Sequence, residues 1–205
     1  IKAGFMVGSE RLKQYVQRFG FGQRAGSELA GESRGLWSPP SDLSGLASIS
    51  MGYQISVTPL QMAAAASAVA NGGLLVRPHV VRAIVRDGQR DVVASSPVRR
   101  VISPATAATL TTIMEGVTGR GTARSAQVER YQVAGKTGTA QDYTNVYFAG
   151  YTPQVSTAVW VGFANGQVPM DSFYGGSVFG GTVAAPIWHD FMVRAMQGFP
   201  VQGFE

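Results

Sequence analysis

The residues best suited to chemistry in this 205-residue chain lie in one short stretch, VAGKTGTAQ at 133–141. It places an ammonium group at Lys136, hydroxyl groups at Thr137 and Thr139, and no side chain at Gly138. Ammonium and hydroxyl groups donate hydrogen bonds to a carboxylate, and a charge-assisted bond is worth about 1.5–3 kcal/mol. Gly138 lets a ligand approach the main chain, because a Cβ atom would stand in its way. The stretch therefore predicts a site for a carboxylate and the chain attached to it.

A β-strand over 132–140 is the element expected to position these groups. Side chains on a strand alternate between faces, so Lys136 and Gly138 share one face while Thr137 and Thr139 share the other. An edge strand also offers free N–H groups, which bind an extended peptide or point at a developing oxyanion. We therefore expect an edge strand that holds a peptide's terminal carboxylate and stabilises acyl transfer. The alternative is an ordinary strand-end turn, since Lys-Thr-Gly alone arises by chance in roughly one such chain in twenty.

Capping residues, turn residues and apolar spacing divide the rest of the chain into helices and strands. We predict helices over 9–20 with Ser9 as N-cap, 58–71 with a Thr58–Gln61 capping box, 103–117 with Ser103 as N-cap, and 186–197. We predict strands over 132–140, 146–151 and 156–163, a hairpin within 79–95 turning at Asp87-Gly88, a long surface loop over 20–52, a flexible loop over 118–126 and a glycine-rich loop over 173–181. Helices before and after an antiparallel meander indicate an α+β fold, with an antiparallel sheet flanked by helices.

Composition narrows the class of protein. Hydrophobic residues make up 45% of the chain, enough for one well-packed domain or two small ones. The net charge of +5 permits attraction to anionic polymers or a lipid surface, but no basic run is interleaved with aromatic residues, so we expect no nucleic-acid partner. The chain has no cysteine, and His79 and His189 lack clustered carboxylates, so we expect no metal site. No stretch approaches the roughly 20 apolar residues that cross a bilayer.

Four segments, in the same order over nearly the whole chain, resemble the transpeptidase domain of penicillin-binding proteins. They are GYQISVTPLQMA at 52–63, EGVTGRGTA at 115–123, AGKTGTAQ at 134–141, and GG followed by AAPIW near the end. That family combines a Ser-x-x-Lys nucleophile motif, a Ser-Asp-Asn-type motif and Lys-Thr-Gly. The resemblance implies the β-lactamase/transpeptidase-like fold. It also implies a serine D,D-transpeptidase that cross-links peptidoglycan stem peptides, is acylated by β-lactam antibiotics and uses no metal or organic cofactor.

The resemblance also implies a role for each residue of the strand. Lys136 would be the catalytic lysine of the third motif, which biases the electrostatics of the cleft and of the second-motif serine. Thr137 and Thr139 would hold the terminal carboxylate of a D-Ala-D-Ala donor or of an antibiotic, and Gly138 would belong to the same substrate-binding strand, where it lets the ligand approach the main chain. Thr139 would also give its main-chain N–H to the oxyanion hole, a kind of donor worth about a hundred- to thousandfold in turnover.

The chain departs from the family pattern because it contains neither Ser-x-x-Lys nor Ser-x-Asn. The YTN at 143–145 follows Lys-Thr-Gly, whereas the family's Tyr-x-Asn variant precedes it, so we assign YTN to a turn. The first residues, IKAGFMVGSERLKQYVQRFGFG, resemble the family helix that follows the second motif. We therefore expect residues 1–205 to be the C-terminal portion of a transpeptidase domain, inactive alone. The nucleophile would then lie on an N-terminal remainder and the membrane anchor outside this chain.

The sequence leaves alternatives open for the enzyme subclass and for the reaction. Residues 52–141 resemble monofunctional class B synthases, whereas FAGYTPQVSTAVWVGF and AAPIWHDFM resemble the tails of bifunctional class A enzymes. The monofunctional type is favoured because its matches cover more of the chain. The same fold also serves D,D-carboxypeptidases and β-lactamases, and a non-catalytic β-lactam sensor would need no nucleophile. The complete protein is expected at the extracytoplasmic face of the cytoplasmic membrane, in the periplasm or its equivalent.

A few side chains outside the strand carry weaker predictions. Phe148, Trp160 and Phe163 follow strand alternation and are expected in the core. Arg120 and Arg124 flank the loop at 118–126, where they either line the mouth of a cleft or are solvated.

Overall fold

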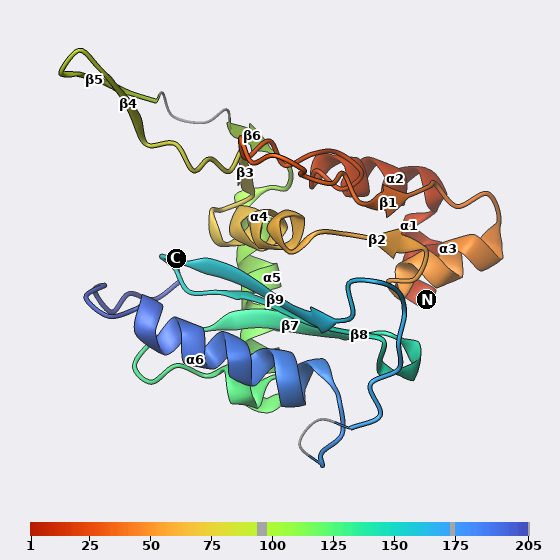
Figure 1. The fold of residues 1–205 in the computed structure, drawn as a ribbon. Helices are drawn as coiled ribbons and strands as arrows, with labels where there is room; N and C mark the ends of the chain where they lie inside the picture. Colours follow the sequence, from red (N-terminus) through yellow and green to blue (C-terminus); the bar gives the residue numbers. More distant parts are fainter. Residues whose placement is uncertain (94–97, 173–174, 205) are drawn as a thin grey trace. The chain divides into compact units, whose positions relative to one another are not determined.

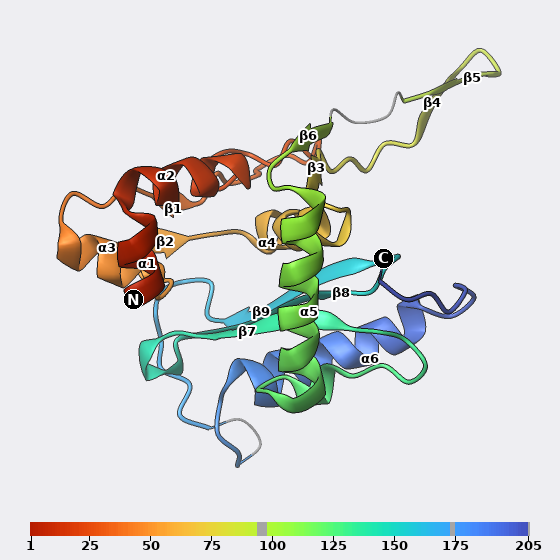
Figure 2. The ribbon, with the colours of Figure 1, turned by 180° about the vertical axis from the view of Figure 1, so that it is seen from behind.

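The computed structural model describes residues 1–93, 98–172 and 175–204 (Figures 1 and 2). The chain divides into two compact units. The first unit comprises Ile1–Ala65 and Leu74–Val101, and the second comprises Ala66–Gly73 and Ile102–Glu205. Of the glycine-rich loop expected at 173–181, Phe173 and Tyr174 lie outside the described residues. Within the described part of the chain, no helix has the length and apolar character needed to span a bilayer.

The first unit begins with two short helices, α1 (Lys2–Val7) and α2 (Ser9–Arg18). The predicted N-cap of α2 is wrong: Gly8 occupies that position, and the Ser9 hydroxyl instead donates to the carbonyl of Pro40 at 3.3 Å. Gly8 has φ of +77°, a conformation that glycine adopts readily, and this lets the chain turn between the two helices. Gly20, at φ of +84°, follows α2 as the predicted stop.

The long loop expected over 20–52 is wrong in part, because it contains ordered elements. Strand β1 (Leu36–Trp37) pairs antiparallel with β2 (Ile55–Ser56), and α3 (Leu43–Ser50) lies between them in sequence. Asp42 caps α3, its carboxylate accepting the N–H of Gly45 at 2.7 Å. The serines and glycine of α3 hide its helical pattern, and only Leu46 and Ile49 are buried.

Helix α4 (Pro59–Ala70) confirms the predicted capping box. The N–H of Thr58 donates to Gln61 Oε1 at 2.8 Å, and the N–H of Gln61 donates to Thr58 Oγ1 at 3.1 Å. Gln61 does more than cap, because its Nε2 donates to the carbonyls of Gln23 at 2.7 Å and Arg34 at 3.0 Å. One nearly buried side chain therefore joins the start of α4 to the segment that follows α2.

Replacing Gln61 by alanine is expected to destabilise the first unit by about 2–4 kcal/mol, because the cap is lost and two carbonyl groups lose their donor. The free energy of opening in the first unit is measured by native-state hydrogen exchange. Gln17→Ala is the control, since Gln17 is an exposed glutamine of α2. Equal effects of the two substitutions would contradict this role for Gln61.

Two antiparallel strand pairs complete the first unit. β3 (Leu74–Val76) pairs with β6 (Val98–Arg100), and β4 (Ala83–Arg86) pairs with β5 (Gln89–Val92). The predicted hairpin turn is confirmed, since Asp87 and Gly88 both have positive φ, at 49° and 77°. The β3–β6 pair was not predicted.

The second unit is a three-stranded antiparallel sheet with a helix on each face (Figures 1 and 2). Its strands follow the predicted meander in the order β7 (Ala134–Thr139), β8 (Asn145–Tyr151) and β9 (Ser156–Gly162). Helix α5 (Pro104–Arg120) packs on one face, where Tyr151 Oη and Thr111 Oγ1 lie 2.8 Å apart, and α6 (Ala185–Ala195) covers the other. The α+β class is confirmed.

Short helical segments connect these elements. They are η1 (Arg124–Ala126), η2 (Gln141–Tyr143) and η3 (Gly180–Ala184). The predicted cap of α5 is confirmed, since the Ser103 hydroxyl accepts the N–H of Thr106 at 3.1 Å. The flexible loop expected over 118–126 is wrong: α5 continues to Arg120, and Thr118, Ala123 and Ala126 are buried. The YTN segment lies at the turn between β7 and β8, as predicted.

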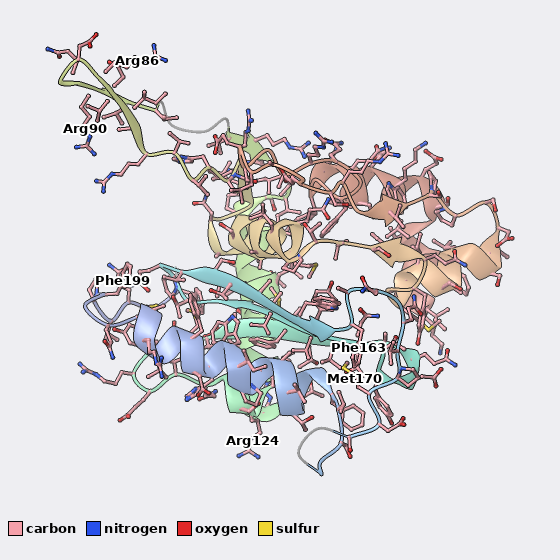
Figure 3. The ribbon with its side chains drawn as sticks, viewed as in Figure 1. Arg86, Arg90, Arg124, Phe163, Met170 and Phe199 are labelled. Atoms are coloured by element: carbon pink, nitrogen blue, oxygen red, sulfur yellow. The ribbon has the colours of Figure 1, made fainter. Side chains whose placement is uncertain are left out.

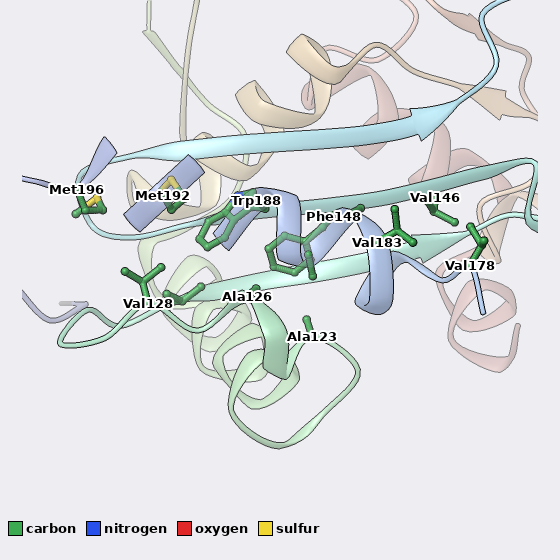
Figure 4. Close-up of a cluster of buried hydrophobic side chains, with 13 residues drawn as sticks. Ala123, Ala126, Val128, Val146, Phe148, Val178, Val183, Trp188, Met192 and Met196 are labelled. Carbon is green, nitrogen blue, oxygen red and sulfur yellow. The ribbon is translucent and has the colours of Figure 1, made fainter. Parts of the chain in front are cut away.

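The core of the second unit lies between α6 and the sheet (Figure 4). Phe148 of β8 meets Trp188 of α6 edge to face, with ring centroids 5.2 Å apart, which confirms Phe148 as a core residue. Trp160 is half-buried, and its indole N–H donates to Asn145 Oδ1 at 2.8 Å. The prediction for Phe163 is wrong: its side chain is 52% exposed, because β9 ends at Gly162 and Phe163 lies beyond the paired sheet (Figure 3).

Candidate active site

Strand β7 carries the candidate residues and forms one edge of the described sheet. In its pairing with β8, Lys136 lies opposite Ala149 and Thr137 opposite Phe148. Thr137 therefore shares the α6 face with Phe148, while Lys136 lies on the face that α5 covers. The predicted alternation of side chains along β7 is confirmed.

The hydrogen-bond pattern of β7 sets the direction of its main-chain groups. Ala140 donates its N–H to the carbonyl of Asn145 at 2.8 Å, which makes these two residues a hydrogen-bonded pair. Pairs alternate along an antiparallel ladder, so Thr139 and Thr137 occupy the positions whose N–H and C=O point away from β8. The Lys136 ammonium donates to the carbonyl of Thr137, as expected for an outward-pointing group. Main-chain donors and acceptors at Thr137 and Thr139 therefore face the open edge.

A small polar network joins this edge to the end of α5. The Lys136 side chain bends toward the strand edge, and its ammonium donates to Thr137 Oγ1 at 3.3 Å. Thr137 Oγ1 also lies 2.9 Å from Thr122 Oγ1, just after α5. Thr122 was not predicted as a site residue, although it belongs to the segment 115–123 that carries the family resemblance. The network gathers one ammonium and two hydroxyl groups within reach of an anion.

Thr139 is held from a different direction. Its Oγ1 accepts the N–H of Gly180 at 3.1 Å, at the start of η3. Gly180 lies directly on the strand main chain: a Cβ atom there would be 2.7 Å from the carbonyl oxygen of Gly138 and 2.5 Å from that of Tyr147. Only glycine fits this position without displacing the strands, which gives a physical reason for the GG of the last resemblance segment. The Thr139 hydroxyl proton stays available to donate to a ligand.

Gly138 has a packing role as well as the predicted one. A Cβ atom added there would lie 3.3 Å from Tyr147 Cβ, which is closer than ordinary van der Waals contact. Its absence therefore lets β7 and β8 approach closely, besides keeping the strand main chain accessible to a ligand.

A groove of about 590 Å³ opens beside Lys136 in the second unit. Its walls come from Lys136, from Thr122 and from the C-terminal half of α5, including Arg120 and Ile113. Ile113 is 60% exposed. Of Arg120 and Arg124, each expected either to line a cleft mouth or to be solvated, Arg120 lines this groove, whereas Arg124 does not and is exposed (Figure 3). Two cations on one groove favour an anionic ligand.

The two histidines have main-chain partners. His189 Nδ1 lies 2.6 Å from the carbonyl of Gln127, and His79 Nδ1 lies 3.1 Å from that of Val81. Among the described residues, no group of three or more His, Cys, Asp or Glu side chains is arranged to hold a metal ion.

The Lys136 side chain is exposed along part of its length, but its ammonium is held against the strand edge. This partial burial lowers the pKa of Lys136 below the usual lysine value, because desolvation disfavours the charged form. Above the lowered pKa the folded protein binds fewer protons than the unfolded one. The contribution of Lys136 to the free energy of unfolding therefore rises with pH between its folded and unfolded pKa values.

The titration of Lys136 can be isolated because the chain has only three lysines. In a Lys2→Arg, Lys13→Arg variant, we expect the ¹³C-methyl signal of reductively methylated Lys136 to titrate at a lower pH in the folded protein than in urea. Carbon NMR measures both midpoints in one sample. Equal midpoints would show that the ammonium is fully solvated.

Comparison with known proteins finds relatives over nearly the whole chain. The chain is 36% identical over 206 residues to stage V sporulation protein D of Bacillus subtilis (strain 168), covering 94% of this chain and 31% of that protein. It is 34% identical to penicillin-binding protein 1A of Neisseria gonorrhoeae, covering 97% of this chain and 23% of that protein. The chain thus spans less than a third of the length of these two relatives.

Solved structures give the same result for the fold. Apo penicillin-binding protein 3 from Mycobacterium tuberculosis is similar with a TM-score of 0.80 and 31% identity, covering 97% of this chain and 49% of that one. Its complex with aztreonam also gives a TM-score of 0.80. A family model described as the penicillin binding protein transpeptidase domain matches residues 2–193. With 192 of its residues matched and Lys-Thr-Gly on an open sheet edge, this chain belongs to the penicillin-binding protein transpeptidase family.

Proposed function

We propose that this chain forms the substrate-holding part of a peptidoglycan D,D-transpeptidase, which cross-links stem peptides through a serine acyl-enzyme. The observation that carries the proposal is the edge of β7, where the Lys136 ammonium and the Thr137 and Thr122 hydroxyls gather beside outward-facing main-chain groups. Family membership supports it. So do the solved complexes of penicillin-binding protein 3 with aztreonam and with ampicillin, since β-lactams react as analogues of the donor peptide.

Each group on the edge then has a part in acyl transfer. The Thr137 and Thr139 hydroxyls donate to the terminal carboxylate of a D-Ala-D-Ala donor, and the charge of Lys136 stabilises that anion. The donor peptide lies along the open edge as an added strand. The outward N–H of Thr139 donates to the carbonyl oxygen under attack, which becomes an oxyanion as the serine oxygen bonds to the carbonyl carbon. The bond to the terminal D-Ala then breaks, its amine taking up the serine proton through the base, and the ester remains. The amine of a second stem peptide attacks this ester, the serine ester bond breaks, and the proton lost by the amine returns to the serine oxygen as the cross-link forms.

In this proposal the attacking serine lies on other polypeptide, since the 205 residues contain no Ser-x-x-Lys. We propose that residues 1–205 are the C-terminal portion of the transpeptidase domain, with the nucleophile and its base on an N-terminal remainder. Acyl transfer needs nucleophile, base and oxyanion donors assembled together. The complete protein would be a monofunctional enzyme held at the extracytoplasmic face of the cytoplasmic membrane by an anchor outside this chain.

Labelling with fluorescent penicillin tests the proposal. We expect the complete protein to form a covalent adduct that unlabelled ampicillin prevents, and residues 1–205 alone, shown to be folded by circular dichroism, to form none. Covalent labelling of the shorter chain would refute the external nucleophile. Failure of the complete protein to label would refute the transpeptidase function and would favour a non-catalytic β-lactam sensor, the alternative that the missing serine also accommodates. If the adduct forms, release of cross-linked rather than hydrolysed peptide separates a transpeptidase from a carboxypeptidase or β-lactamase.

A further inference from the structure

A second pocket, of about 250 Å³, lies within the first unit and is lined by three arginines. Arg24 follows α2, Arg77 follows β3, and Arg99 lies in β6. The pocket is otherwise mainly apolar, and its apolar lining residues are Phe19, Ala25, Ala64, Leu75, Val76, Pro78 and Val98. It therefore combines cationic groups with a surface suited to an apolar body.

Neutral main-chain groups hold two of these arginines in place. Arg77 Nε donates to the carbonyl of Gly26 at 2.7 Å, and Arg99 Nη2 donates to the carbonyl of Gln17 at 3.2 Å. Within the part of the chain that the structure describes, none of the three guanidinium groups forms an ion pair with a carboxylate. Each keeps further N–H donors and its full charge for another partner.

The wall that carries Arg24 is also fixed. The nearby carboxylate of Glu32 accepts the N–H groups of Gly26 at 3.0 Å and of Ser27 at 3.2 Å, so its oxygens are committed to the main chain. Gln61 adds its bond to the carbonyl of Gln23, next to Arg24. A pocket whose walls are tied in this way loses little conformational freedom when it binds a ligand.

The net positive charge of the chain is concentrated in the unit that contains the pocket. The first unit holds twelve basic and six acidic residues, a net charge of +6, whereas the second holds five and six, a net charge of −1. All the positive excess of the chain therefore belongs to the unit that contains this pocket. Such a field attracts anions toward it.

We propose that the pocket is a binding site for an organic phosphate, whose phosphate lies on the three guanidinium groups and whose apolar part lies on the pocket floor. Guanidinium groups match phosphate oxygens with paired N–H donors, and three cations favour an anionic phosphate, whether a doubly charged monoester or a singly charged diester. A soluble phosphate ester and the headgroup of an anionic phospholipid both present this chemistry. The site is separate from the edge of β7 and does not depend on the function proposed for it.

Isothermal titration calorimetry of the complete protein with phenyl phosphate at low salt tests the site. We expect saturable binding, no binding of phenol, and a loss of affinity of about fivefold or more in each of Arg24→Gln, Arg77→Gln and Arg99→Gln. Arg86→Gln, which removes an exposed cation of β4, is the matched control and should change the affinity less than about twofold. No saturation by about 10 mM, or an equal loss in Arg86→Gln, would overturn the proposal.

Vesicles then identify the source of the phosphate. One outcome is that the protein sediments with phosphatidylglycerol vesicles and not with phosphatidylcholine vesicles. If phenyl phosphate and Arg77→Gln each abolish that sedimentation, the pocket is assigned to a lipid headgroup. Binding of phenyl phosphate without sedimentation assigns it to a soluble ester. Thermal unfolding of every variant by circular dichroism shows that the pocket, and not the fold, has changed.

Discussion

Replacing Lys136 by glutamine in the complete protein is expected to slow acylation by fluorescent penicillin about 10- to 150-fold. The ammonium lies at the edge of β7 and donates to Thr137, so glutamine removes its charge from the place where a ligand carboxylate would bind. A charged hydrogen bond is worth about 1.5–3 kcal/mol, and each 1.36 kcal/mol corresponds to a tenfold change in rate. The second-order rate constant of acylation, from stopped time courses at several penicillin concentrations, measures the effect.

Lys13→Gln is the matched control, since Lys13 is a lysine of α2 that pairs only loosely with Glu10, at 4.0 Å. This substitution removes the same charge outside the candidate site and should leave the rate within about twofold, because surface ion pairs contribute little. If Lys136→Gln is acylated as fast as the unmodified protein, the ammonium does not stabilise the bound carboxylate.

Truncating Trp188 to alanine is expected to destabilise the second unit by about 3–5 kcal/mol, the cost of removing a large aromatic side chain from a packed core. Trp188 is fully buried, lies edge to face against Phe148, and donates its indole N–H to the carbonyl of Thr157 at 3.1 Å. The substitution therefore leaves a cavity between α6 and the sheet and removes the donor of Thr157. Urea denaturation, monitored by hydrogen exchange of the β8 amides, measures the loss in the free energy of unfolding.

Phe191 provides the comparison on the same helix, because its side chain is 53% exposed. Phe191→Ala should cost less than about 1.5 kcal/mol, since little of its surface leaves water on folding. Similar losses for the two substitutions would mean that α6 does not hold the sheet through the Trp188 contact.

Local sequence signals predicted the elements whose boundaries depend on neighbours in the chain. The capping box at Thr58, the cap at Ser103 and the turn at Asp87-Gly88 all form from residues within four positions of one another. The failures have non-local causes. The β3–β6 pair joins segments more than twenty residues apart, and α3 is stabilised by burying only two side chains.

The same distinction explains which parts of the site could be predicted. Alternation along one strand places Lys136, Thr137 and Thr139 correctly, because it is a property of the strand alone. Thr122 and Gly180 reach the strand from fifteen and about forty residues away, and only the folded chain brings them there. The glycine and threonine of GRGTA, and the GG before AAPIW, were visible in sequence only as parts of a family resemblance.

The contact of Gly180 with β7 couples the position of the C-terminal segment to the position of the strand. A Cβ atom at Gly180 would clash with the carbonyl oxygens of Gly138 and Tyr147, so η3 lies too close to the strands for any side chain there, and the Gly180 N–H also donates to Thr139 Oγ1. Packed interiors transmit small displacements instead of absorbing them. Under the proposed function, a substitution in η3 can therefore change ligand binding by reorienting the Thr139 hydroxyl, while the Lys-Thr-Gly sequence stays intact.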